Sequence, residues 1–128
     1  MTDYSNIPDC FYRVSIKALV LDEEGGFLLI RESDGNWSFP GGGLEYSDKS
    51  IKECLKRELY EEMGVELLSV DEQPSYFVVS ENSNGFFQAN VFYKTVLKNL
   101  NFMPSDECRE IRFFASEEAK NLYPPTNV

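Results

Sequence analysis

The chain has 128 residues, of which 42% are hydrophobic and 14% aromatic, which is enough apolar material for one well-filled core. We therefore expect a single domain over residues 1–128. The net charge of −10 disfavours polymeric nucleic acid as a partner, and the absence of histidine excludes Ser-His-Asp and Cys-His nucleophilic schemes and H-E-x-x-H zinc sites.

The same acidity restricts the kind of ligand. A chain with 22 acidic and 12 basic residues repels a small polyphosphate unless a divalent cation lies between the carboxylates and the substrate. No apolar run approaches the roughly eighteen residues of a membrane span, and the N-terminus lacks a signal-peptide pattern, so we expect a cytoplasmic protein without membrane contact. Three cysteines without a C-x-x-C pair predict buried thiols at Cys10, Cys54 and Cys108.

The first third of the chain is rich in strand-forming residues. Residues 11–21 and 27–30 are β-branched and aromatic and flank the turn-forming residues 22–26, which predicts a β-hairpin. Further along we expect a turn at 33–36, a short strand at 37–39 and, at 40–43, a Pro-Gly-Gly-Gly loop that lets a ligand approach the backbone closely.

A helix of strong helix formers follows over residues 50–63, with Ser47 and Asp48 as plausible caps and Gly64 as its end. The rest of the chain predicts strand-rich stretches at 65–80 and 86–98 around a turn at 82–85, a strand at 109–115, and a helix at 116–122 capped by Ser116 and stopped by Pro124-Pro125. This order predicts an α/β architecture in which a mixed β-sheet packs between helices.

Three glutamates of the long helix fall on or beside its apolar face. On a helix that turns by about 100° per residue, and with Ile51 at zero, the angular position of Glu58 is about −20°, that of Glu62 about +20° and that of Glu61 about −80°. The apolar residues Leu55 and Leu59 share this face. Acids in a solvated cluster should lie on the side of the helix opposite this apolar face. Burying unpaired carboxylates costs roughly several kcal/mol or forces them to take up protons.

A divalent cation resolves this conflict. Hard cations such as Mg²⁺ and Mn²⁺ prefer oxygen ligands, and three carboxylates within one helical turn provide them. Arg57 precedes Glu58 and is expected to fix the orientation of a carboxylate, although an ordinary surface arginine has the same sequence appearance.

The stretch Arg57-Glu58-Leu59-Tyr60-Glu61-Glu62-Met63-Gly64-Val65 resembles the R-E-U-x-E-E-x-G-U core of the Nudix box of MutT-like hydrolases at every fixed position, where U is a bulky aliphatic residue. Upstream, residues 37–45 resemble the aromatic and Pro-Gly-Gly lead-in of that family, and residues 110–118 resemble its last strand and short helix. With Gly42 as the box glycine, the chain has one extra residue at the start of the helix, Lys49 separated from Arg57 by seven residues, and Asp48 in place of the usual Glu.

The resemblance implies a Nudix-type α/β/α sandwich and attack of water on phosphorus in a nucleoside diphosphate linked to another moiety. It implies that Glu58, Glu61 and Glu62 bind Mg²⁺ or Mn²⁺ together with the Gly41 carbonyl, with Arg57 in the catalytic set. The proton acceptor is Glu58 or an acid of a later loop. Further candidates are Glu107 and Glu81 as that later acid, and Arg31, Gly42 and Gly43 as substrate-binding residues.

Two other functions belong to different classes. A Nudix-fold regulatory module would bind a nucleotide without hydrolysing it, and an isoprenoid diphosphate isomerase would need a catalytic cysteine, whereas Cys54 lies on the box helix. Oxidised nucleoside triphosphates, ADP-ribose, nucleotide sugars and dinucleoside polyphosphates all stay open as small-molecule substrates, as does homodimerisation. Core packing is favoured over nucleobase stacking for most of the aromatics between residues 66 and 108, which are Tyr76, Phe77, Phe86, Phe87, Phe92 and Tyr93.

Overall fold

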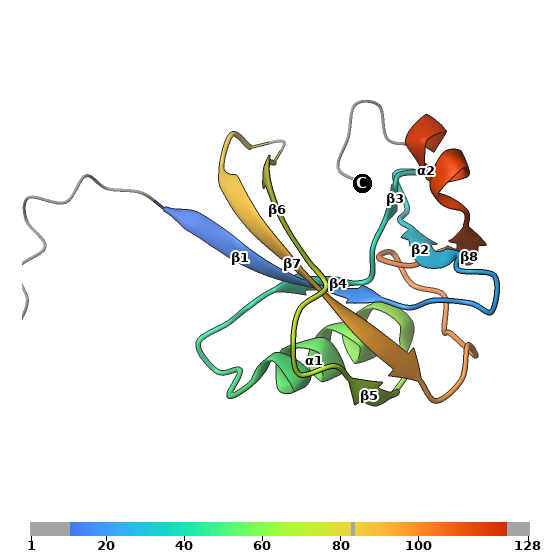
Figure 1. Cartoon of the computed structure of the whole chain (residues 1–128), viewed down its shortest axis with the longest axis horizontal. Coiled ribbons are helices and arrows are strands. Elements are labelled where there is room, and N and C mark those ends of the chain that lie inside the picture. The colour runs from blue at the N-terminus through green and yellow to red at the C-terminus, as the bar shows by residue number, and fades with distance from the viewer. Residues whose placement is uncertain (1–10, 83, 123–128) are drawn as a thin grey trace, which may run out of the picture.

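The computed structural model describes residues 11–82 and 84–122, which form strands and two helices (Figure 1). The elements in chain order are β1 (Tyr12–Leu19), β2 (Phe27–Arg31), β3 (Trp37–Ser38), β4 (Gly41–Gly43), α1 (Ile51–Met63), β5 (Leu67–Val70), β6 (Tyr76–Glu81), β7 (Phe87–Leu97), β8 (Glu110–Phe114) and α2 (Ser116–Leu122). The α/β expectation with a mixed sheet is confirmed, because β1 and β7 pair in parallel while their other partners are antiparallel.

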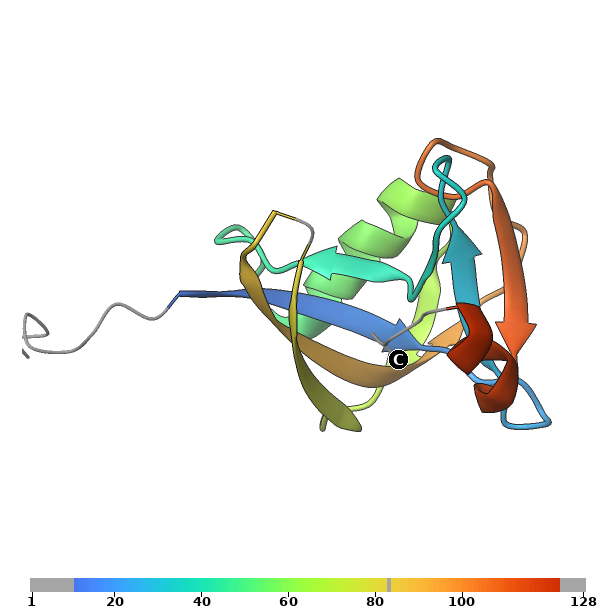
Figure 2. The same cartoon turned by 90° about the horizontal axis from the view of Figure 1, so that it is seen from above.

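The strands form two sheets that meet at an angle (Figure 2). The five-stranded sheet has the order β4-β1-β7-β5, with β6 also paired to β7, and the three-stranded sheet has the order β3-β2-β8. Helix α1 packs against the five-stranded sheet, and α2 follows β8 beside the smaller sheet (Figure 1). The main core lies under α1 and is built from Ile16, Ala18, Cys54, Leu55, Leu59, Met63 and Tyr93, among others.

The predicted β-hairpin between residues 11–21 and 27–30 forms only beside its turn, where Leu28 N–H donates to the Val20 carbonyl. The turn itself forms, because Asp22 N–H donates to the Gly26 carbonyl and Asp22 Oδ1 accepts from Gly26 N–H. Beyond an isolated bridge between Leu21 and Phe27, however, the two strands enter different sheets. Both edges of β1 are already paired with β4 and β7, so no edge remains for β2.

The predicted loop at residues 40–43 is also partly wrong, because Gly41–Gly43 is a strand that pairs antiparallel with Ser15–Lys17 of β1. A Cβ atom on Gly41 would overlap the carbonyl oxygen of Ile16, and the backbone of Gly41 has a φ of 127°. Only glycine accommodates both the space and the conformation. The sequence suggested that these glycines let a ligand approach the backbone. In the structure, their lack of side chains lets β1 approach instead.

The predicted caps of both helices are wrong. Ser50 caps α1, since its Oγ accepts a hydrogen bond from Glu53 N–H at 3.1 Å, whereas Ser47 and Asp48 lie in the preceding loop. Ser116 is the first residue of α2 and therefore not its cap. The backbone N–H of Ala115, just before the helix, donates to Glu118 Oε1 at 3.1 Å. The end of α1 is confirmed, because Gly64 adopts the left-handed conformation with a φ of 67°. The predicted stop at Pro124-Pro125 lies outside the described residues.

The thiols of Cys54 and Cys108 are buried and free, as expected, while Cys10 lies outside the described residues. The prediction of core packing for most of the six aromatics is wrong: Phe92 and Tyr93 are buried, whereas Tyr76, Phe77, Phe86 and Phe87 are exposed. These four lie in β6, at the start of β7 and in the turn between them. Neither helix in the described part of the chain has the length and apolarity required to cross a membrane.

The stability of the fold should depend on the buried face of α1. Leu59 is fully buried in the main core, so Leu59→Ala removes buried methyl groups and leaves a cavity, and we expect a loss of about 2–5 kcal/mol in the free energy of unfolding. Urea denaturation followed by circular dichroism measures this loss. The neighbouring Tyr60 is 68% exposed, so Tyr60→Ala should change stability by no more than about 0.5 kcal/mol, and equal losses in the two variants would contradict the assigned face.

Candidate active site

Arg57 donates hydrogen bonds to polar groups of α1, of β4 and of the loop between them. Its Nε donates to Asp48 Oδ1 at 3.1 Å and its Nη2 to Asp48 Oδ2 at 2.8 Å, which is a bidentate pair. Nη2 also donates to the Gly43 carbonyl at 3.2 Å, and Nη1 donates to Glu58 Oε1 at 2.8 Å. The guanidinium therefore fixes the loop acid, the glycine strand and a helical glutamate relative to one another.

The acid that meets Arg57 at the start of the helix is Asp48. Its hydrogen bonds with Arg57 lower the pKa of the Asp48 carboxyl to about 2, and the same bonds raise the pKa of Arg57. Asp48 Oδ2 also accepts from Glu45 N–H at 2.9 Å, which holds the loop. The neighbouring Lys49 instead donates its backbone N–H to Glu53 Oε2 at 3.1 Å. Asp48 thus supplies the charge that Arg57 requires.

Glu58 lies between Arg57 and the glycine strand. Its side chain is 14% exposed, and a Cβ atom on Gly42 would overlap its carboxylate. Desolvation raises the pKa of Glu58, and the guanidinium of Arg57 opposes that shift. The bare backbone of Gly42 therefore provides the space in which this carboxylate sits.

Glu62 is the most buried of the three helical acids, with 7% of its surface exposed. Its Oε1 accepts a hydrogen bond from Gly41 N–H at 2.8 Å. Desolvation raises the pKa of Glu62 to about 8, although the Gly41 N–H and the charge of Lys17 act in the opposite direction. Glu61 differs, since its side chain is 54% exposed and lies 3.5 Å from Arg57 Nη1.

The donor set suits a hard divalent cation. Among the described residues no three acidic, histidine or cysteine side chains are already gathered closely enough to hold a metal ion. The donor chemistry nevertheless fits one, because three carboxylates project from one turn of α1 and two of them are substantially buried. The cradle above Gly42 is a further sign, since a side chain there would fill it.

The two candidates for a later acid are in different places. Glu107 precedes β8, and its charge raises the pKa of Glu58, Glu62 and Glu32. It therefore lies close to these carboxylates, which we call the acid cluster. Glu81 is the last residue of β6 and lies beside Gly85 of the β6–β7 turn. The fold thus brings Glu107 to the site and leaves Glu81 in a hairpin turn.

Arg31, the candidate phosphate contact, ends β2. Its Nε donates to Glu110 Oε2 at 3.0 Å, and this ion pair joins the neighbouring strands β2 and β8. Both side chains are partly exposed, at 39% and 46%. A phosphate that binds Arg31 would therefore compete with Glu110 for the guanidinium.

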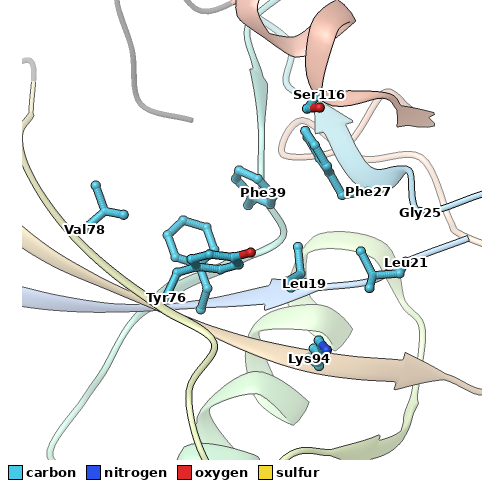
Figure 3. Close-up of a pocket in the computed structure, with 10 residues that line it drawn as sticks. Leu19, Leu21, Gly25, Phe27, Phe39, Tyr76, Val78, Lys94 and Ser116 are labelled. Carbon is cyan, nitrogen blue, oxygen red and sulfur yellow. The ribbon is translucent and has the colours of Figure 1, made fainter.

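A pocket of about 480 Å³ opens between the two sheets (Figure 3). Its walls are mainly apolar and aromatic and include Leu19, Phe27, Phe39, Tyr76, Phe92 and Lys94. Sequence reasoning did not identify this pocket, because its walls come from strands far apart in the chain. It also missed Lys17, whose only sequence signal is a charge within an otherwise apolar run, Ile16 to Leu21.

The Asp48–Arg57 pair should stabilise the protein in a pH-dependent manner. Because the folded-state pKa of Asp48 lies at about 2 and its ordinary value is 3.8, its contribution is complete above pH 3.8 and is lost as the pH falls towards 2. Asp48→Asn should therefore lower the melting temperature at pH 7, and the difference from wild type should shrink between about pH 4 and pH 2. Thermal melts across this range test it; a difference independent of pH would contradict the ion pair.

Comparison with known proteins agrees with this arrangement. A family model described as a NUDIX domain matches residues 11–127. The nucleoside triphosphatase NudI of Escherichia coli O139:H28 (strain E24377A / ETEC) is 36% identical over 64 residues, which are 45% of each chain. A MutT-like protein of Streptomyces ambofaciens is 40% identical over 62 residues, which are 48% of this chain and 39% of that protein. The match thus spans less than half the length of these relatives.

Among solved structures, the MutT protein from Methanosarcina mazei Go1 superimposes with a TM-score of 0.69 at 27% identity, over 84% of this chain and 79% of that chain. The predicted α/β/α sandwich is thereby confirmed. Since the family model covers nearly the whole chain and the fold agrees, this chain belongs to the Nudix family.

Proposed function

We propose that the chain is a hydrolase that uses Mg²⁺ or Mn²⁺ to cleave the diphosphate linkage of a nucleoside diphosphate joined to another moiety. Nudix hydrolases act on nucleoside diphosphate derivatives and generally use a divalent metal. The observation that carries the proposal is the set of three α1 glutamates, of which Glu58 is held by Arg57 above Gly42 and Glu62 is held by Gly41.

Each residue has a distinct part in this mechanism. Glu58, Glu61 and Glu62 would hold the metal with the Gly41 carbonyl, and Arg57 orients Glu58 through the 2.8 Å hydrogen bond. A bound divalent cation supplies positive charge to the phosphates and acidity to the attacking water. Glu58 or Glu107 would accept the proton of the attacking water, and the influence of the Glu107 charge on Glu58 and Glu62 supports Glu107 as a candidate.

The pocket between the sheets supports a nucleoside as one part of the substrate. Its volume of about 480 Å³ is in the range of small-molecule sites, and the aromatic rings of Phe27, Phe39 and Tyr76 line it. The relative from Escherichia coli is named a nucleoside triphosphatase, which supports nucleoside triphosphates as the first compounds to test. Homodimerisation and a cytoplasmic location stay predictions, as does a single domain over residues 1–128.

The alternative is a regulatory module that binds nucleotide without cleaving it. Such modules commonly lose box acids, whereas this chain keeps all three helical acids and Arg57, which favours catalysis. An isomerase that uses Cys54 for proton transfer is disfavoured, because that thiol is fully buried and desolvation raises its pKa to about 12.

Removing the charge of Glu62 at constant size tests the metal-dependent mechanism. Glu62→Gln should lower kcat by about 100-fold or more, because it removes a ligand charge while the side chain keeps its volume. The assay is release of phosphate and nucleotide from nucleoside triphosphates, ADP-ribose, nucleotide sugars and dinucleoside polyphosphates, with Mg²⁺ or Mn²⁺ and with chelator.

Glu66→Gln is the matched control, since Glu66 is exposed and pairs only with Lys98 at 2.7 Å among the described contacts. It should retain the activity of the wild type. Normal turnover in Glu62→Gln would refute the assigned carboxylates, and metal-dependent nucleotide binding without cleavage of any substrate would favour the regulatory module.

The pocket is tested by Tyr76, which is 62% exposed and whose removal should not disturb the core. If its ring stacks on the base, Tyr76→Ala should raise KM for the cleaved nucleotide by about threefold to tenfold with little change in kcat. Phe77 is 64% exposed on the opposite face of the same strand, so Phe77→Ala provides a control of equal exposure. An equal rise in KM for the two variants would exclude this pocket as the base site.

A further inference from the structure

Lys17 occupies the strand that separates the pocket from the carboxylates. It is in register with Gly41 of β4 on one side and with Phe92 of β7 on the other. Because directly opposed residues of neighbouring strands share a face, Lys17 lies on the same face as Phe92, and by alternation on the same face as Leu19. Phe92 and Leu19 line the pocket, and Leu19 points into it in Figure 3.

On its other side Lys17 opposes Gly41, whose N–H donates to Glu62. The charges of Glu62, Glu32 and Glu58 all act on its ammonium group, in that order of strength. Burial is the larger influence and lowers the pKa of Lys17. Lys17 is thus a partly buried cation on a strand that lies between Phe92, which lines the pocket, and Gly41, which binds Glu62.

Two of these three acids, Glu58 and Glu62, already accept hydrogen bonds from other groups. Glu58 accepts from Arg57, and Glu62 accepts from the Gly41 N–H. In the part of the chain that the structure describes, the Lys17 ammonium has neither a hydrogen-bond partner nor a close ion pair. A partly buried ammonium that makes no direct contact with a carboxylate keeps its three donors available for an anion that reaches it.

We propose that Lys17 forms a phosphate-binding subsite for the phosphate chain of the substrate between the pocket and the helical carboxylates. This inference rests on the proposed function, since it assumes that a nucleoside occupies the pocket and that its phosphates reach the metal site. A chain of phosphates that joins the two passes Lys17, and each ammonium–phosphate contact is a charge-assisted hydrogen bond. Lys17 therefore selects substrates that have a phosphate between the base-bearing moiety and the cleaved linkage.

Binding of inorganic pyrophosphate in the presence of Mg²⁺, measured by titration calorimetry, tests the subsite without requiring turnover or a known nucleotide. Lys17→Met keeps the length of the side chain and removes the charge, and should weaken pyrophosphate binding by about tenfold or more. The matched control is Lys98→Met, which makes the same change at an exposed lysine paired with Glu66, and it should bind as wild type does. Lys17→Gln decides the result if Lys17→Met does not fold.

A purely structural role for Lys17 predicts a different pattern. In that case Lys17→Met would lower the urea midpoint and leave pyrophosphate affinity per folded molecule unchanged, which would overturn the proposal, as would a wild-type protein that does not bind pyrophosphate. With a nucleotide that the enzyme cleaves, the subsite predicts a rise in KM that exceeds any fall in kcat. Pyrophosphate binding that requires Lys17 in a protein that cleaves no nucleotide would retain the subsite and reject the hydrolase.

Discussion

The bidentate pair of Arg57 with Asp48 is the interaction on which the site depends. A planar guanidinium that binds both carboxylate oxygens at 3.1 Å and 2.8 Å fixes the loop against α1 in one orientation. The remaining donors then hold Glu58 and the Gly43 carbonyl, so that helix, loop and strand β4 share one cation. A lysine could not make these contacts together, because its ammonium is a point charge without the planar fork.

The glycines of β4 also position the helical carboxylates. Gly41 lies against the Ile16 carbonyl and donates its N–H to Glu62, and Gly42 leaves room for the Glu58 carboxylate. Strand β4 is therefore a spacer of minimal thickness between β1 and α1. Two carboxylates with raised pKa values and the ammonium of Lys17, on which their charges act, lie around this spacer. A divalent cation bound there would stabilise the two carboxylates in their charged form.

Local pattern was sufficient for the helix and its acids. A period of 3.6 residues put Glu62 in the apolar stripe and Glu61 at its edge, and their exposures of 7% and 54% follow that order. The predicted hairpin forms only beside its turn because the number of free strand edges depends on β4 and β7, which lie far along the chain from β1. The pocket and Lys17 were missed for the same reason, since parallel pairing with β7 sets what Lys17 faces.

The central claim is that the α1 carboxylates form a divalent-cation site. Its most direct test is titration of Mn²⁺ followed by electron paramagnetic resonance, for the wild type and for a Glu58→Gln/Glu62→Gln double variant whose fold is verified by circular dichroism. The account predicts saturable Mn²⁺ binding by the wild type that is weakened by at least about tenfold in the variant. Equal Mn²⁺ binding by the two proteins would contradict it and would place the metal at other residues.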